Sequence, residues 1–267
     1  MEQLKDIILT KLKNETDGIE KQWTTSHGIP TRYFYIDNFL PDKLANDIYD
    51  SFPKDHNEFY KRKSFREKKS TFAKLANTST ILSDITKVFQ LPEVIKEIST
   101  IVDMDELEAD PSLYAGGLSM MFKGDFLNPH IDNSHDGDRL RYRRLNLLYY
   151  VTPDWKLENG GNFELWDHNV KTQNTILSKF NRLVVMETND KSWHSVSPVA
   201  VDGTRTCVSN YYFSQNSPNG SEYFHVTSFT GRPDQKGTRI LGVVDNLVRN
   251  TISKTLKIGR GKRLINK

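Results

Sequence analysis

Cysteine is the scarcest residue type in this sequence, because Cys207 is the single one among 267 residues. A disulfide within the chain is therefore excluded, which is typical of proteins that fold in a reducing compartment. The sequence also lacks an apolar run long enough to cross a membrane, and residues 1–5 lack the apolar core of a secretory signal. These absences predict a cytoplasmic protein without a membrane partner.

A large excess of either charge is lacking as well. Lys and Arg number 37 against 34 Asp and Glu, which gives a formal net charge of +3. That excess is too small to predict a nucleic-acid partner. Residues 254–267 are locally basic, but such a tail is most often a solvated end, with contact to phosphate or nucleic acid as the alternative.

Short strand patterns separated by turns dominate residues 113–215. Gly, Asn and Asp mark turns at 123–125, 159–161 and 202–203. The strand pattern is strongest in six segments, 118–122, 145–151, 162–166, 175–177, 183–187 and 205–213. The region is therefore predicted to be mainly β, with a jelly-roll or cupin-like barrel whose mouth is a usual place for a small-molecule site.

Residues 1–112 show helical, strand and loop patterns. Apolar spacing predicts helices over 4–12, 41–52 and 92–102 and a strand over 33–40, whereas the charged residues 54–70 indicate an exposed loop. We expect these elements to pack on the barrel.

Residues 216–267 contain a polar, lid-like stretch and then a helical pattern. Over 238–256 the apolar residues fall at 240, 241, 243, 244, 247, 248 and 252, which predicts an amphipathic helix packed on the barrel. We expect residues 1–112, the core 113–215 and residues 216–267 to form one structural domain.

Four residues of the β-rich region form a constellation, and three of them can bind a metal. His130 and Asp132 lie two residues apart, so their side chains leave an extended strand on the same face, and His194 is a third ligand from a later strand. Two imidazoles and one carboxylate leave the opposite side of a metal open, which favours non-haem Fe(II) over structural zinc. Arg205 follows in a strand and could bind a dicarboxylate.

Each member of the constellation has a simpler alternative. His130 and Asp132 could lie in a surface turn, His194 could be an ordinary packed histidine, and Arg205 could pair with Asp202 at the surface. His135 lies close enough in sequence to compete as a ligand, although its loop of Asn, Asp and Gly predicts a solvated side chain.

Five segments together resemble a known family. They are 124–132 (GDFLNPHID), 143–151 (RRLNLLYYV), 159–165 (NGGNFEL), 193–196 (WHSV) and the strand that begins at Arg205. In this order they resemble the 2-oxoglutarate- and Fe(II)-dependent oxygenases, in particular the prolyl-4-hydroxylase-like branch.

This resemblance implies a double-stranded β-helix core with flanking helices. It implies that His130, Asp132 and His194 hold Fe(II), that Arg205 binds the far carboxylate of 2-oxoglutarate, and that Tyr150 offers a hydroxyl to it. Asn146 shares the face of Tyr150 by strand alternation and is a further candidate in the cosubstrate site. With O2 as the second cosubstrate, the implied reaction hydroxylates an unactivated C–H bond and releases succinate and CO2.

The chain departs from the family at two positions. Phe122 stands where many relatives have a tyrosine that could bond 2-oxoglutarate, and Cys207 stands where some branches have serine. Neither change removes a metal ligand. Asp132 also favours hydroxylation over halogenation, since halogenating relatives have a small residue there.

The resemblance leaves the substrate open among a prolyl residue of a peptide or protein, a free amino acid and a sugar-linked metabolite. The alternative to an enzyme is a cupin-like ligand-binding module with an idle metal site. Residues 133–141 and 214–224 could close over the barrel mouth, in which case Arg139, Arg141 and Tyr223 would contribute to substrate coupling.

Overall fold

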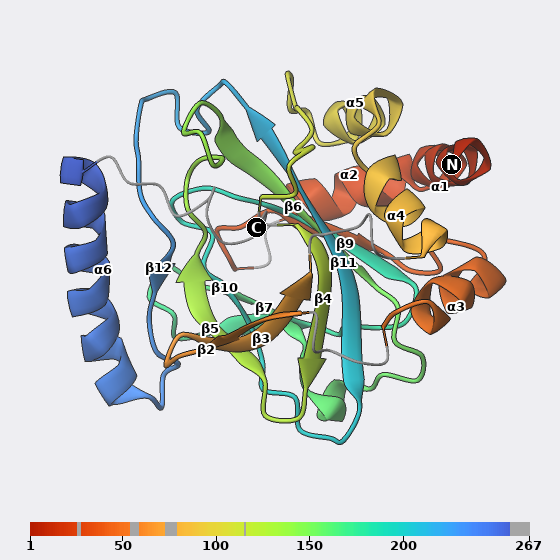
Figure 1. Cartoon of the computed structure of the whole chain (residues 1–267). Helices are drawn as coiled ribbons and strands as arrows, with labels where there is room; N and C mark the ends of the chain where they lie inside the picture. Colours follow the sequence, from red (N-terminus) through yellow and green to blue (C-terminus); the bar gives the residue numbers. More distant parts are fainter. Residues whose placement is uncertain (26–27, 54–58, 73–78, 115, 257–267) are drawn as a thin grey trace.

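Twelve antiparallel strands form one continuous sheet in the computed structural model, which describes residues 1–25, 28–53, 59–72, 79–114 and 116–256 (Figure 1). The strands are β1 (Tyr33–Ile36), β2 (Tyr60–Lys63), β3 (Glu67–Phe72), β4 (Gly117–Phe122), β5 (Phe126–Ile131), β6 (Tyr142–Tyr150), β7 (Phe163–Trp166), β8 (Gln173–Ile176), β9 (Arg182–Glu187), β10 (His194–Val196), β11 (Thr204–Ser214) and β12 (Ser228–Phe229). Their main order is β1-β9-β6-β11-β4-β3-β5-β10-β7-β8, with β2 beside β3 and β12 beside β5.

The sheet curls so that its two halves face each other. Phe163 of β7 and Ile176 of β8 pack in one buried cluster with Tyr150 of β6, Val184 of β9 and Cys207 of β11. Strands from opposite ends of the strand order therefore enclose a common interior. This is the double-stranded β-helix expected from the sequence.

The other face of the larger half is covered by helices. They are α1 (Glu2–Asn14), α2 (Thr16–Thr24), α3 (Asp42–Asp50), α4 (Thr80–Val88) and α5 (Pro92–Ile101), with α6 (Lys236–Leu256) standing apart on the far side (Figure 1). Alternation on β6 explains the two layers: Leu147 and Tyr149 point into the helix-side core, whereas Tyr150 points into the interior cluster.

The predicted helices over 4–12, 41–52 and 92–102 are present as α1, α3 and α5, and the six predicted strands are present with shifted ends. The loop predicted over 54–70 is wrong where the structure describes it, because β2 and β3 form a hairpin that pairs with β4 and β5. Few of its side chains are buried, so the segment has no apolar alternation that would identify strands; residues 54–58 lie outside the described part.

The helix predicted over 238–256 is confirmed as α6 and packs on β12, but it does so through its polar face and not through its apolar face. Leu241, Val244 and Leu247 are exposed, while Asn246 and Gly242 lie against β12. An amphipathic pattern defines two faces of a helix, and it does not state which of them the protein covers.

In the described part of the chain, no helix is both long enough and apolar enough to cross a membrane.

Candidate metal centre

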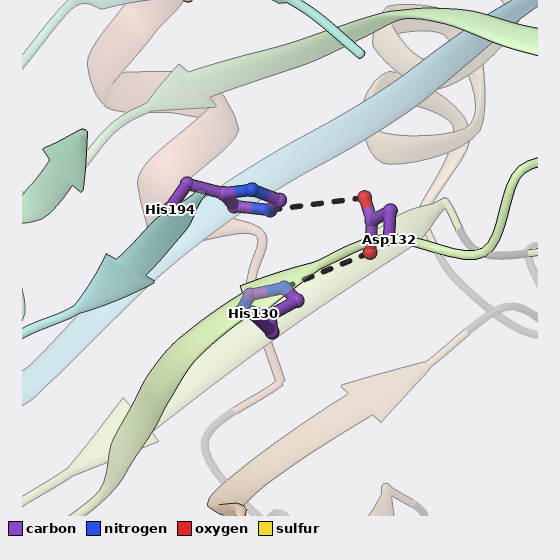
Figure 2. Close-up of side chains that lie close together, drawn as sticks. All are labelled: His130, Asp132 and His194. Atoms are coloured by element: carbon purple, nitrogen blue, oxygen red, sulfur yellow. Dashed lines mark ion pairs between the residues drawn. The ribbon is translucent and has the colours of Figure 1, made fainter. Parts of the chain in front are cut away.

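Strand pairing brings the three predicted metal ligands together inside the curled sheet. His194 of β10 is the direct cross-strand partner of His130 of β5, and Asp132 follows two residues after His130. The Nε2 atoms of His130 and His194 lie 3.6 and 3.7 Å from the two carboxylate oxygens of Asp132 (Figure 2). The three ligand atoms lie within 4.8 Å of one another.

Backbone contacts orient both imidazoles for metal binding. Nδ1 of His130 lies 3.0 Å from the carbonyl oxygen of Asn128, and Nδ1 of His194 lies 2.9 Å from that of Ser192. If each Nδ1–H donates to its carbonyl, Nε2 keeps a lone pair that points at the cluster. Burial lowers the pKa of His130 to about 3, with a smaller contribution from His194, so the imidazole is neutral at ordinary pH.

Arg143 holds the carboxylate of the cluster. Its Nη1 lies 2.9 Å from Oδ2 of Asp132, and its Nη2 donates to Oδ1 of Asn133 at 3.0 Å. Burial by itself would raise the pKa of Asp132, but Arg143 and the two nearby imidazoles hold that pKa below its usual range. The cluster therefore contains an ionised carboxylate and two neutral imidazoles, which is the donor set that a divalent metal requires.

Sequence reasoning missed Arg143, because a β-bulge places it on the interior face. Tyr211 of β11 pairs with Asn146 and Tyr212 with Leu145, but Phe213 pairs with Arg143, so Arg144 is the extra residue. Strict alternation from Asn146 would have placed Arg143 on the helix side. The bulge instead places its guanidinium 4.2 Å from the ring centre of Tyr211.

A second group of polar side chains lies on the interior faces of β6 and β11. Arg205, Tyr150 and Asn146 are all buried. Nε and Nη1 of Arg205, the hydroxyl of Tyr150 and Oδ1 of Asn146 have no hydrogen-bond partner of good geometry among the described residues. Burial raises the pKa of Tyr150 to about 12 against the opposing effect of Arg205, so this hydroxyl keeps its proton.

Buried polar atoms without partners are rare, and a buried guanidinium without an acid beside it is costly. Arg205 lies 4.9 Å from the ring centre of Tyr150 and makes no ion pair among the described residues. A bound carboxylate would supply the missing charge and accept the free N–H groups. These residues therefore fit an anionic ligand, and the His130, Asp132 and His194 cluster fits a divalent metal.

The structure differs from the interpretation of the sequence at Arg205, His135 and Phe122. Asp202 pairs with Lys123 at 2.9 Å, while Arg205 is buried, so the surface ion pair between Asp202 and Arg205 is wrong. His135 is buried against Tyr142 and stands outside the metal cluster, so its prediction as a solvated side chain is also wrong.

Phe122 lies away from the interior site. In the β4–β11 register Phe122 is opposite Thr204, whereas Met121 is opposite Arg205. Phe122 packs on the helix-side core and is on the face opposite to Arg205. The absence of a tyrosine hydroxyl at this position therefore removes no hydrogen-bond partner from the interior site.

Sequence reasoning also missed Phe229. After β11 the chain returns to form β12, which pairs with β5 so that Phe229 is opposite His130. The two rings stack with their centres 5.1 Å apart. A strand of two residues is too short to show a recognisable sequence pattern. Its pairing with β5 places residues from beyond the core segment 113–215 next to the metal centre.

The two candidate lid segments contact each other beside the cluster. Tyr223 packs against Tyr142, and Arg139 lies over the ring of Phe224, 4.3 Å from its centre. Arg141 pairs with Asp136 at 2.8 Å. The predicted role of these segments in substrate coupling stays a prediction.

Comparison with known proteins agrees with this geometry. Residues 116–213 match the sequence profile of the 2OG-Fe(II) oxygenase superfamily. This segment contains the three candidate ligands and Arg205 within the curled antiparallel sheet. Over this segment the chain is similar to the 2OG-Fe(II) oxygenase superfamily, in which Fe(II) and 2-oxoglutarate are the typical metal and cosubstrate.

Among curated proteins, the sequence is similar to prolyl 3-hydroxylase OGFOD1. The mouse protein (Mus musculus) is 29% identical over 96 residues, which cover 34% of this chain and 17% of that protein. The Xenopus laevis protein is 30% identical over 103 residues, which cover 35% of this chain and 20% of that protein. The matched segments thus span a fifth or less of these relatives.

Among solved structures, the fold is similar to prolyl 4-hydroxylases. The structure from Phytophthora capsici has a TM-score of 0.55 at 18% identity and covers 94% of this chain and 77% of its own. That from Pseudomonas putida has a TM-score of 0.54 at 15% identity and covers 74% of this chain and 98% of its own. At such identities the likeness shows the double-stranded β-helix fold.

Proposed function

We propose that this protein is an Fe(II)- and 2-oxoglutarate-dependent dioxygenase that hydroxylates a C–H bond of a prolyl residue in a peptide or protein. The observation that carries the proposal is that one curled sheet encloses two sites, one that fits a metal ion and one that fits a carboxylate. The cluster of His130, Asp132 and His194 fits a divalent metal, and the buried Arg205 fits a carboxylate.

In this proposal His130, Asp132 and His194 hold Fe(II). Their donor atoms come from one side, which leaves the opposite side of the ion open to other ligands. Arg143 fixes the orientation of the Asp132 carboxylate, and the backbone carbonyls next to Nδ1 fix both rings. The protein thus presents the ligands without needing to rearrange them.

Arg205 is the proposed anchor for the far carboxylate of 2-oxoglutarate. Its free N–H groups can form the paired hydrogen bonds that a carboxylate accepts. The protonated hydroxyl of Tyr150 can donate one further hydrogen bond to the same ligand. Asn146 is a third polar group of this interior, and its role is to position the ligand or a bridging water.

Fe(II) with 2-oxoglutarate and O2 supplies, in this superfamily, oxidative decarboxylation that yields succinate and CO2 and inserts the second oxygen atom into a C–H bond. The surrounding residues exclude water from that chemistry: Tyr150, Cys207, Phe163 and Leu165 are buried around the cosubstrate site. Burial raises the pKa of Cys207 to about 12, so its thiol stays protonated and contributes packing. Asp132 favours hydroxylation over halogenation.

Similarity to named prolyl hydroxylases supports a prolyl substrate. The curated relatives are prolyl 3-hydroxylases, and the solved structures with similar folds are prolyl 4-hydroxylases. The resemblance of the motifs is to the 4-hydroxylase-like branch. We therefore propose prolyl hydroxylation, and product analysis has to distinguish carbon 4 from carbon 3.

We further propose that residues 1–112, 113–215 and 216–267 form one structural domain, because β1, β3 and β12 all hydrogen-bond into the core sheet. A cytoplasmic location is supported by the single, buried cysteine.

The test of the proposed function is turnover of 2-oxoglutarate by the Fe(II)-loaded protein with candidate substrates. A panel would contain prolyl peptides, free amino acids and sugar-linked metabolites, with succinate and the substrate product measured in parallel. We expect prolyl peptides to stimulate succinate release and to gain one oxygen atom on the proline ring. NMR of the product would identify the hydroxylated carbon.

Two outcomes would overturn different parts of the proposal. Stimulation by a free amino acid or sugar alone would contradict a prolyl substrate but keep the oxygenase. Binding of metal and 2-oxoglutarate without succinate formation, with any substrate of the panel, would favour a ligand-binding module with an idle metal.

A further inference from the structure

Helix α6 binds to the rest of the protein through its polar face. The side-chain amide of Asn246 donates to the carbonyl of Phe229 at 2.8 Å and accepts from its N–H at 2.9 Å. The backbone N–H of Val226 donates to Asn250 at 3.2 Å. At Gly242 a Cβ atom would lie 2.5 Å from the Phe229 carbonyl oxygen, so only glycine permits this close approach.

The opposite face of α6 is apolar and exposed. We call it the α6 apolar face and define it by six side chains that are 50–69% exposed, Ile240, Leu241, Val243, Val244, Leu247 and Val248. More than half of the large hydrophobic side chains exposed in the described part of the chain lie on this helix. A contiguous exposed apolar surface of this kind marks a site that binds another molecule.

One further exposed apolar residue lies near α6. Phe65 precedes Arg66, whose Nε donates to Asp245 of α6 at 2.9 Å and whose guanidinium lies 4.9 Å from the ring centre of Phe65. Phe65 can therefore extend the apolar surface.

We propose that the α6 apolar face is the interface of a homodimer, in which α6 of one copy packs against α6 of a second copy. The face consists of Val, Leu and Ile, the residues that fill helix–helix cores, and it contains no charge. A two-fold axis across the helix would place the same surface on both sides, which is the usual form of a homodimer contact.

The amount of surface is sufficient for such a contact. An unfolded chain exposes about 1.45 Å² per dalton, so six Val, Leu or Ile residues at these exposures present roughly 550 Å² per copy. Two copies would bury roughly 1,100 Å², which exceeds the about 1,000 Å² that a biological interface should clear and lies just below the about 1,200 Å² of standard-size interfaces. Phe65 would add to that area.

A lipid surface fits the described residues less well. Helices that lie on membranes usually combine aromatic residues with free basic side chains beside the apolar face. The α6 apolar face contains no aromatic residue. Beside it Arg66 pairs with Asp245, and Arg239 donates to the backbone carbonyls of Asn169 and Val170.

The test is the molar mass of the full chain in solution, measured by light scattering over a range of concentrations. We expect twice the 30.9 kDa of one chain at high concentration. Leu247→Glu should raise the dimer dissociation constant at least about a hundredfold, because the two-fold axis places two like charges in the contact. Leu157→Glu is the control, since Leu157 is an exposed leucine outside α6.

Cross-linking provides a second measurement that tolerates a weak dimer. Cys207 is buried, so a cysteine introduced by Val244→Cys would be the reactive thiol. We expect an intermolecular disulfide from this variant and none from Leu157→Cys. A monomer at every concentration that also fails to cross-link would overturn the proposal, as would a monomer that sediments with vesicles of phosphatidylcholine and phosphatidylserine.

Discussion

The two ends of the barrel interior differ in whether the protein supplies an ion-pair partner for its own buried charge. At the metal end, Asp132 lies beside Arg143 and between two imidazoles, so its charge is balanced before any metal binds. At the other end, Arg205, Tyr150 and Asn146 keep buried atoms without partners. The difference suggests that the metal ligands are pre-arranged, whereas the second site is completed by its anionic ligand.

The largest expected effect lies at the metal end. His130→Ala, Asp132→Ala and His194→Ala should each nearly abolish Fe(II) binding and turnover, because each removes one of three donor atoms. Fe(II) titration and succinate release would measure the two effects. The control is His168→Ala, which changes an exposed histidine outside the cluster. Normal turnover in a folded ligand variant would contradict the ligand assignment.

The next effect concerns Arg143 as a positioning residue. Arg143→Leu should weaken Fe(II) affinity by about 10–100-fold, the usual range for a group that orients a metal ligand. Arg182→Leu is the matched control, since Arg182 is another strand arginine that binds a carboxylate, Asp37, away from the metal. It should lower thermal stability and leave Fe(II) affinity unchanged. Equal metal affinities in the two variants would remove Arg143 from this role.

At the cosubstrate end, Arg205→Ala should weaken the binding of 2-oxoglutarate by about 2 kcal/mol or more, which is a roughly thirtyfold rise in its apparent dissociation constant. The guanidinium loses its bound carboxylate, whereas the Fe(II) ligands are untouched. Binding titrations with the metal present would measure the change. Lys123→Ala, which removes an exposed cation paired with Asp202, should have no effect.

Tyr150→Phe should have a milder effect at the same end. It removes one hydrogen bond, worth about 0.5–1.5 kcal/mol, or roughly two- to tenfold in 2-oxoglutarate affinity. The same binding titration applies. If Tyr150→Phe and Arg205→Ala weaken binding equally, Arg205 is not the anchor.

The smallest effect on 2-oxoglutarate binding is expected from the candidate lid. Arg139→Ala, Arg141→Ala and Tyr223→Ala should lower substrate hydroxylation while succinate still forms, because they leave the metal and cosubstrate residues in place. The ratio of succinate to hydroxylated product is the measurement. An unchanged ratio in all three variants would identify the segments as plain connections.

The sequence predicted the parts of the site that depend on local spacing. His130 and Asp132 share a face because they lie two apart, and Tyr150 and Asn146 share one because they lie four apart on a strand. Such relations hold in any fold that keeps the strand extended. The distant His194 and Arg205 came from their places in later strand patterns together with the family resemblance, because local spacing cannot connect them.

The parts that the sequence did not predict depend on tertiary structure. Arg143 reaches Asp132 because of a bulge at Arg144, and a bulge has no signal in a run of alternating residues. The amphipathic pattern of α6 does not show that its polar face packs inward, because that packing rests on hydrogen bonds from Asn246 to the edge of β12 and on the close approach that Gly242 permits. In both places a backbone contact decides which face points inward.

The measurement that tests the central claim most directly is an anaerobic titration of 2-oxoglutarate into the Fe(II)-loaded protein, followed by the visible absorption that appears when a 2-oxo acid chelates Fe(II). The account predicts saturation at one equivalent for the unchanged protein, a strongly right-shifted curve for Arg205→Ala and no absorption for Asp132→Ala. Absence of the band in the unchanged protein, or identical curves for it and Arg205→Ala, would contradict the assignment of two complementary sites in one barrel.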